Sequence, residues 1–189
     1  MKPLGFETRP WPGRLLELLQ PSWSKRRRRF PAPTRPIHYL RGCLGGLALV
    51  VFGAQVLSGL AMLAWFQPWS QGAGAGILGL ESGGVPGWML RRLHAAGGDL
   101  LLLLVLLHLL RVLWSGAFRP PREWNWLSGL GLAGLALVGA LSGSALAAPG
   151  LQPAPAWLVV LHLGLPLLMI LLMRLHFRMV RRTGLSGPL

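Results

Sequence analysis

Four long blocks of apolar residues dominate the sequence, separated by short connections rich in glycine, proline or charged residues. Each block approaches the roughly 20 residues with which an α-helix crosses about 30 Å of hydrocarbon. The first block begins too late and is too long for a signal peptide, so we interpret it as a retained membrane span. The four blocks run over about Leu44–Phe66, Trp88–Leu113, Trp126–Ala148 and Ala156–Phe177.

The composition agrees with four spans, because 52% of the residues are hydrophobic and only 13% are charged. A soluble core would not accommodate four such blocks in 189 residues. The pattern therefore predicts an all-α fold, an integral membrane four-helix bundle over residues 39–189 without an internal domain boundary. Residues 1–38 form a basic arm, in which Arg14–Gln20 is spaced as a short amphipathic helix.

Positive charge is distributed unevenly along the chain. The net charge of +14 and the run Lys25–Arg29 raise the question of nucleic-acid binding. Ten of the 19 basic residues precede the first block, whereas the connections 67–87 and 149–155 contain no lysine or arginine. By the positive-inside rule, an even number of spans with this asymmetry places both termini in the cytoplasm. We expect the arm to lie against anionic lipid headgroups, with no nucleic acid as a partner.

Four of the five histidines lie inside predicted spans and repeat one spacing. His94 and His108 are 14 residues apart in the second span, and His162 and His176 are 14 apart in the fourth. Fourteen residues turn a helix by about 1400°, within about 40° of four turns, and advance it by about 21 Å. Both helices run in the same direction, so His94 lies level with His162 and His108 with His176. This arrangement predicts two haems b, each held by two histidines.

Two other interpretations of the histidines stay open at this point. A histidine in a span can serve only as a hydrogen-bonding contact between helices. Two pairs with a common spacing on alternate helices favour ligation over that role. A metal site without haem is less favoured, because no cysteine or carboxylate lies beside either pair to complete a zinc or iron ligand set.

Glycines in the first and third spans repeat the same interval of 14 residues. A porphyrin is wide and flat, so a helix that passes its edge or face needs positions without a side chain. Ordinary helix packing explains each glycine alone, since the chain has 26 of them, but the shared interval favours a role beside the haems. The two pairs are Gly45 with Gly59 and Gly129 with Gly143.

Three stretches of the chain carry a resemblance to a known family. The first span reads GCLGGLALVVFGAQVLSGLAM, and the second span with its following connection reads GWMLRRLHAAGGDLLLLLVLLHLLRVLWSGAFRPPREWNWLSG. The last span and the C-terminus read LHLGLPLLMILLMRLHFRMVRRTGLSGPL. Over about residues 39–189 the chain resembles cytochrome b6, the N-terminal cytochrome b of b6f-type and Gram-positive quinol–cytochrome c reductases.

The resemblance implies a dihaem cytochrome b subunit of a respiratory or photosynthetic complex that oxidises quinol and moves electrons across the membrane. Such a subunit is not catalytic alone, and belongs to an oxidoreductase that reduces cytochrome c or a plastocyanin-like acceptor. Quinone or menaquinone is the implied substrate, and the membrane is a bacterial inner membrane. The implied complex is homodimeric, and its other members are a Rieske iron–sulfur protein, a c-type cytochrome and a second membrane subunit resembling the C-terminal half of cytochrome b.

Position by position, the resemblance assigns His94 and His162 to a low-potential haem near the outer face. It assigns His108 and His176 to a high-potential haem near the cytoplasm. Arg91 matches a family arginine that pairs with haem propionates, although contact with lipid headgroups would explain this residue equally well.

Two further residues are candidates for contact with the inner haem region. Arg111, three residues after His108, either contacts the inner haem or serves only as a cytoplasmic topology signal. Cys43 directly precedes Leu-Gly-Gly, as does the family cysteine that forms one thioether bond to a third haem. The resemblance thus implies a covalently attached haem at Cys43, and the alternative is a small packing residue.

The chain departs from the family between its third and fourth spans. The family's third helix ends in Pro-Trp-Asp, followed by a segment with short helices over the outer quinol pocket. Here the third span ends in SALAAPG and only about a dozen residues intervene. We therefore keep a second hypothesis, a dihaem membrane anchor of a peripheral dehydrogenase or reductase with one quinone site. A haem-free structural or transport bundle is the third hypothesis.

Overall fold

A computed structural model of the protein describes residues 36–63, 85–148, 151 and 154–183. Within these ranges the chain forms helices and no strands. All four long helices are apolar enough to cross a membrane, which confirms the predicted all-helical fold with four membrane-spanning helices. They are α2 (Pro36–Leu63), α4 (Val85–Trp114), α5 (Glu123–Leu146) and α6 (Ala156–Thr183).

The observed helices begin and end close to the predicted bounds. Helix α2 begins at Pro36 and so includes the last three residues of the predicted arm; at the first position the missing N–H of proline costs no helical hydrogen bond. Helix α6 continues six residues beyond the predicted end, to Thr183. The rest of the arm, including Arg14–Gln20, lies outside the described residues, as do the segments 64–84 and 184–189.

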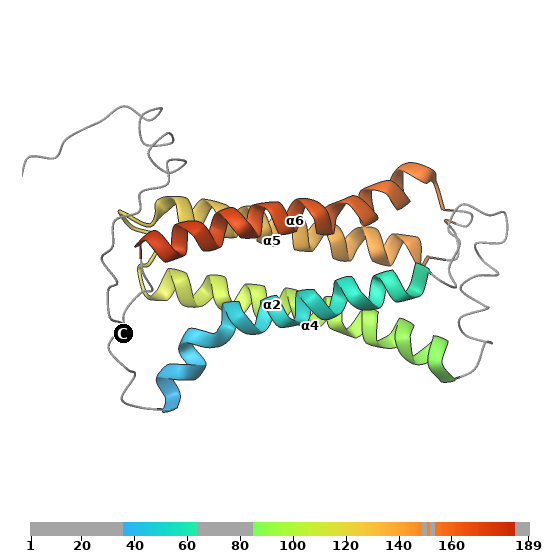
Figure 1. The fold of residues 1–189 in the computed structure, drawn as a ribbon, viewed down its shortest axis with the longest axis horizontal. Coiled ribbons are helices and arrows are strands. Elements are labelled where there is room, and N and C mark those ends of the chain that lie inside the picture. The colour runs from blue at the N-terminus through green and yellow to red at the C-terminus, as the bar shows by residue number, and fades with distance from the viewer. Residues whose placement is uncertain (1–35, 64–84, 149–150, 152–153, 184–189) are drawn as a thin grey trace, which may run out of the picture. The chain divides into compact units, whose positions relative to one another are not determined.

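The chain divides into residues 1–33 and residues 34–189, and the second unit contains all four helices. Consecutive helices run in alternating directions, as Figure 1 shows. Helix α2 packs along α4, α5 packs along α6, and α4 also contacts α5. The two helices with paired histidines, α4 and α6, therefore belong to different helix pairs.

A buried layer at the middle of the bundle receives one side chain from each helix. Each of these residues is seven positions from both ends of the 14-residue interval on its own helix; Leu101, for example, lies midway between His94 and His108. Seven residues are about two helical turns, or about 10.5 Å. The layer therefore separates one histidine level from the other. Its members are Phe52, Leu101, Ala136 and Met169.

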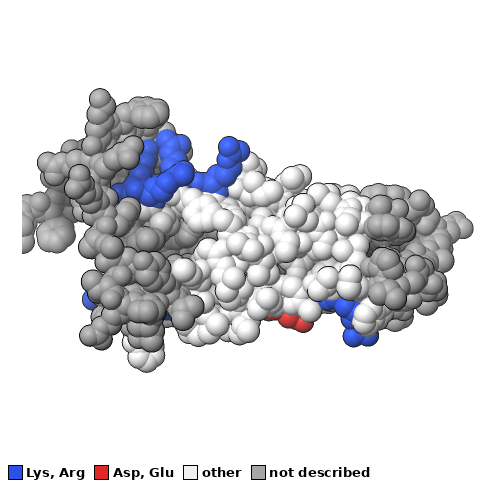
Figure 2. Space-filling model, turned by 60° about the horizontal axis from the view of Figure 1, so that its bottom comes forward, with Lys and Arg blue, Asp and Glu red and all other residues white. Residues whose placement is uncertain are grey.

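The outer surface of the bundle suits contact with lipid. Leu57, Val160 and Leu167 are 71%, 68% and 66% exposed. Figure 2 shows the basic side chains toward the ends of the helices, with a largely uncharged surface between them. Such a surface would be unfavourable in water, and with four spans it marks the chain as an integral multi-pass membrane protein. Asp99 is an exposed carboxylate within α4.

Candidate functional site

Helices α4 and α6 bring two histidines face to face across the bundle. The ring centroids of His94 and His162 are 6.4 Å apart, and their planes are inclined by 75°. Two metal–nitrogen bonds of about 2 Å each fit within this separation. The rest of the separation is the distance from each coordinating nitrogen to the centre of its own ring. We call His94 and His162 the first pair.

A second pair, His108 and His176, comes from the same two helices on the other side of the central layer. These imidazoles are close enough to interact electrostatically. Arg111, one turn further along α4, also lies within electrostatic range of His108. The structure therefore places His94 and His162 face to face and His108 and His176 within electrostatic range of one another, at two levels about 21 Å apart along the helix axes.

Each of the four predicted glycines lies against one of these imidazoles. A Cβ atom at Gly143 would be 3.0 Å from Cε1 of His162, and one at Gly59 would be 3.2 Å from Cε1 of His94. Both distances are shorter than ordinary contacts, so the glycines allow the neighbouring helix to pack directly on the histidine ring. The four contacts are Gly45 with His108, Gly59 with His94, Gly129 with His176 and Gly143 with His162.

Three serines, each preceding one of these glycines, hold the Nδ1 atoms of three imidazoles. The Oγ atoms lie 2.8–2.9 Å from Nδ1, and each hydroxyl donates to the backbone carbonyl three residues earlier at 3.0–3.1 Å. A hydroxyl has one proton, so each Oγ accepts its second hydrogen bond from Nδ1–H. The proton on Nδ1 leaves the lone pair of Nε2 available for a metal. The bonded pairs are Ser58 with His94, Ser128 with His176 and Ser142 with His162.

His108 lacks this support. The residue that precedes Gly45 is Leu44, which has no hydroxyl. The Nδ1 atom of His108 is buried, and it has no hydrogen-bond partner in the described part of the chain. The four sites therefore share the glycine contact but differ in the hydrogen bond.

Gln55 gives the first level an additional connection between α2 and α4. Its side-chain amide donates to the backbone carbonyl of His94 at 2.9 Å. Gly97 makes room for this amide, because a Cβ atom at position 97 would collide with Nε2 of Gln55. On α6, Pro166 has no N–H to donate to the carbonyl of His162, four residues earlier.

The remaining candidates lie near the histidine levels. Arg91 is half-buried on α4, one turn before His94. The neighbouring Arg92 places its guanidinium carbon 5.6 Å from the centre of the Trp88 ring. Cys43 is exposed on α2, two residues before the glycine that contacts His108.

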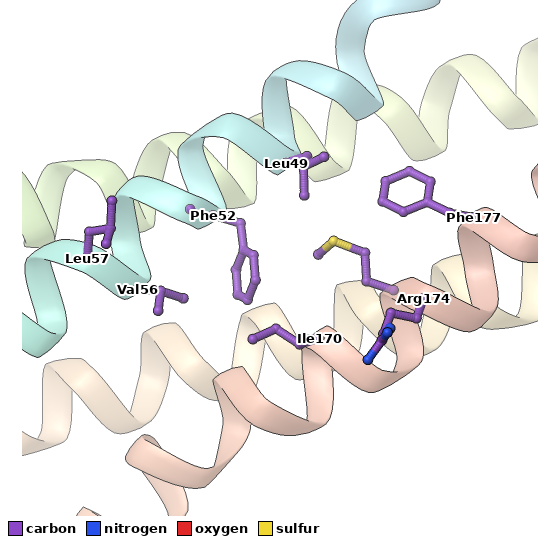
Figure 3. A pocket seen from close by; sticks show the side chains of 9 residues that line it. Leu49, Phe52, Val56, Leu57, Ile170, Arg174 and Phe177 are labelled. Carbon is purple, nitrogen blue, oxygen red and sulfur yellow. The ribbon is translucent and has the colours of Figure 1, made fainter.

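A groove of about 450 Å³ opens between α2 and α6. Figure 3 shows Leu49, Phe52 and Val56 lining it from α2, with Phe177 on the facing side. Arg174 is the basic residue of this otherwise apolar lining, two residues before His176. A cation within a membrane span is costly, and Arg174 is exposed at the edge of the groove.

The serines and Gln55 are site residues that the sequence reasoning missed. A signal for the serines was present, because three of the four glycines at the 14-residue interval belong to a Ser-Gly dipeptide. Only the fourth reads Leu-Gly. No comparable signal pointed to Gln55, whose partner is a backbone carbonyl on another helix.

Comparison with known proteins decides the family. The family model described as cytochrome b/b6/petB matches residues 32–152, which is more than half of the chain. The chain belongs to the cytochrome b family. Membership implies that it binds haem b, and the paired imidazoles and their glycine contacts fit such a group. The predicted resemblance is thereby confirmed.

A solved structure titled "Hyperthermophilic respiratory Complex III" is similar in fold. It aligns with a TM-score of 0.63 and 27% sequence identity. The alignment covers 78% of this chain and 49% of the other. The cytochrome b chain described here therefore spans about half the length of the chain it matches.

The contact between Gly143 and His162 yields a first prediction. Replacing Gly143 with valine forces side-chain atoms into the imidazole, and overpacking of this kind costs about 1–3 kcal/mol. We expect the Gly143→Val variant to unfold at a lower temperature in detergent, measured by tryptophan fluorescence. The control is Gly134→Val on the same helix, where a Cβ atom meets nothing within 4 Å. Equal unfolding temperatures for the two variants would contradict the tight contact.

Proposed function

We propose that this chain is the dihaem cytochrome b subunit of a quinol-oxidising complex of the bc or b6f type. The observation that carries the proposal is the pairing of imidazoles at two levels, with an apolar layer midway between them. One level would suffice to bind a single haem. Two levels about 21 Å apart along the helix axes provide a path across most of a 30 Å hydrocarbon layer.

The residues of this chain bind and orient, while the redox chemistry belongs to the cofactor. Haem b, when bound, supplies an iron that gains and loses single electrons. The first pair would hold one haem and the second pair the other, and Nε2 is the ring nitrogen that each of the three serine-bonded histidines leaves available for iron. Ser58, Ser142 and Ser128 fix the ring orientation through Nδ1. The glycines allow α2 and α5 to pack directly against the imidazole rings of α4 and α6.

We assign the first pair to the outer face of the membrane and the second pair to the cytoplasmic face. Arg178, Arg181 and Arg182 follow the second pair on α6, and Arg111 follows His108 on α4. The positive-inside rule places this end in the cytoplasm together with both termini. We propose that the membrane is a bacterial inner membrane, as the resemblance to cytochrome b6 implies. We also propose that Arg91, one turn before His94, would pair with propionates of the outer haem and that Arg111 would contact the inner haem.

Cys43 supports a third, covalently attached haem. Its thiol is exposed on α2 near the second pair, so a group attached there lies outside the bundle on the cytoplasmic side. A thioether at Cys43 would join this haem to α2 through the edge of the macrocycle. The groove between α2 and α6 extends across the middle of the bundle, since both Leu49 and Leu57 line it on either side of Phe52.

The proposed partners are those that the resemblance to cytochrome b6 implies. The chain matches about half of the Complex III chain, and we propose that a second membrane subunit supplies helices resembling the C-terminal half of cytochrome b. Quinol oxidation also requires a high-potential acceptor, for which a Rieske iron–sulfur protein and a c-type cytochrome are proposed. The complex is proposed to be a homodimer with quinone or menaquinone as its substrate.

A second function is favoured by one observation. Helix α5 ends at Leu146 and α6 begins at Ala156, which leaves little chain to cover an outer quinol pocket. A dihaem anchor for a peripheral dehydrogenase or reductase, with a single quinone site, needs no such cover. The identity of the subunits that accompany the chain separates the two functions.

Haem counting tests the ligand assignment. In the His94→Leu variant the first pair loses one ligand, so we expect one haem b fewer per chain in a pyridine haemochrome assay. The second pair retains its haem, because a layer of apolar side chains separates the two levels. His38→Leu is the control, since His38 lies before the apolar span Cys43–Leu63. An unchanged haem content in His94→Leu would reject the assignment.

Extraction tests the role of Cys43. Acid–acetone removes haem b but leaves a thioether-bound haem on the polypeptide. We expect haem to remain on the wild-type chain after extraction and to be lost from Cys43→Ser, with both b haems retained before extraction. A wild-type chain that releases all of its haem would exclude the covalent group without affecting the two histidine pairs.

Purification from the native membrane tests the complex. We expect an epitope-tagged chain to bring down a Rieske protein and a small multi-pass membrane subunit. Recovery of a peripheral dehydrogenase or reductase in their place would favour the anchor function. The haem content of the same preparation serves as the control for intact protein.

A further inference from the structure

The hydrogen bonds to the four imidazoles are distributed unequally between the two levels. At the first level both Nδ1 atoms are bonded, His94 to Ser58 and His162 to Ser142. At the second level, among the described residues, only His176 has such a bond. Position 44, the equivalent of Ser58 one interval earlier on α2, is a leucine, and Nδ1 of His108 is buried with no hydrogen-bond partner among those residues.

The glycine contacts that the two α4 rings make with α2 are alike. Cε1 of His94 and Cε1 of His108 both lie 3.2 Å from the Cβ position of their glycines on α2. The two rings also belong to one helix and contact one neighbouring helix. The hydroxyl is therefore the local difference between the contacts that these two rings make with α2.

This difference has a direct electronic consequence for a bound iron. An imidazole whose N–H donates to an oxygen is a stronger electron donor through its other nitrogen. Stronger donation stabilises the oxidised iron and lowers its reduction potential, and hydrogen bonding around the ligands is one of the means by which proteins adjust haem potentials. Two such bonds act at the first level and one at the second.

We propose that Ser58 and Ser142 set the outer haem at a lower reduction potential than the inner haem, and that Leu44 keeps the inner potential high by withholding a hydroxyl from His108. The proposal rests on the dihaem function above and goes beyond it by naming the residues that give electron transfer its direction. An electron that enters at the outer level then moves downhill to the inner level. The serines act through the histidines and are positioning residues for the iron.

Arginines lie near both levels, Arg91 three residues before His94 and Arg111 three residues after His108, so charge is a separate influence on either haem. Arg111 lies within electrostatic range of His108, and a positive charge near an iron favours its reduced state. Arg174 lines the groove two residues before His176. A test of the serines must therefore change the hydroxyls and leave these charges in place.

Redox titration of the purified full-length protein, followed through the visible absorption of its haems, provides the test. His94→Leu first identifies the outer haem as the component that disappears. In Ser58→Ala and Ser142→Ala we expect the midpoint potential of the outer haem to rise, with a larger rise in the double variant, while the inner haem is unchanged. In Leu44→Ser, which offers a hydroxyl to His108, we expect the inner potential to fall and the outer to stay.

Two controls separate electronic tuning from a general structural effect. Ser58→Thr retains a hydroxyl and should retain the wild-type outer potential. Ser144→Ala removes an exposed hydroxyl on α5 two residues after Ser142 and should change neither potential. The pyridine haemochrome assay is applied to every variant, so that a shift is counted only where both haems remain bound.

Failure of this inference is distinguishable from failure of the proposed function. Two haems per chain with potentials that do not move in the Ser→Ala and Leu44→Ser variants would overturn the tuning role and leave the dihaem function intact. Absence of haem from the wild-type protein would reject the dihaem function itself. A fall of the outer potential in Ser58→Ala would also overturn the inference, because it reverses the predicted sign.

Discussion

The contact between an imidazole and a side-chain-free position on the next helix is the interaction on which the bundle depends. A histidine is too polar to face lipid and too large to fit between two closely packed helices with ordinary side chains. Glycine at the facing position resolves both problems, because it lets the neighbouring backbone cover the ring. The contact occurs four times, at Gly45, Gly59, Gly129 and Gly143. Each helix pair is thus one helix that carries rings and one that accommodates them.

All four helices share the 14-residue interval, so the contact between glycine and imidazole recurs at two levels of the bundle. Fourteen residues are close to four turns, so the second copy of each contact falls on nearly the same face as the first. The halfway point, seven residues from each level, also faces inward and is occupied by the buried layer of Phe52, Leu101, Ala136 and Met169. Two polar levels enclosed by membrane helices are tolerable because this apolar layer packs between them. The same layer keeps the two sites distinct.

The two levels share the glycine contacts and differ in hydrogen bonding, and this difference is the proposed source of a direction for electron transfer. A repeat alone would give two equivalent sites with no preferred direction of electron flow. The two levels differ at one position of α2, which is Ser58 beside His94 and Leu44 beside His108. Ser58 offers a hydroxyl to Nδ1 of its histidine and Leu44 does not. Arginines lie near both levels, Arg91 beside His94 and Arg111 beside His108, so the hydroxyls are the clearer local difference. Specific function therefore resides in small departures from the repeat.

The sequence by itself determined the number of helices, their approximate bounds and the two levels of histidines. These features follow from local properties of the chain, namely the length of an apolar block and the rotation of a helix over 14 residues. Helix direction alone paired His94 with His162. The sequence signal for the serines was that three of the four glycines follow a serine. This signal indicates a role for the serines only once a histidine is known to lie beside each glycine.

The tertiary structure decided which helix lies against which histidine, where the hydroxyls bond and where the groove opens. Helices that are apolar on all sides carry no polar stripe to fix their rotation about their own axes. That rotation is determined by the fit of glycines to rings and of the central side chains to one another, and these contacts join residues that are distant along the chain. For the same reason Gln55, Gly97 and Arg174 could not be assigned places before the helices were packed.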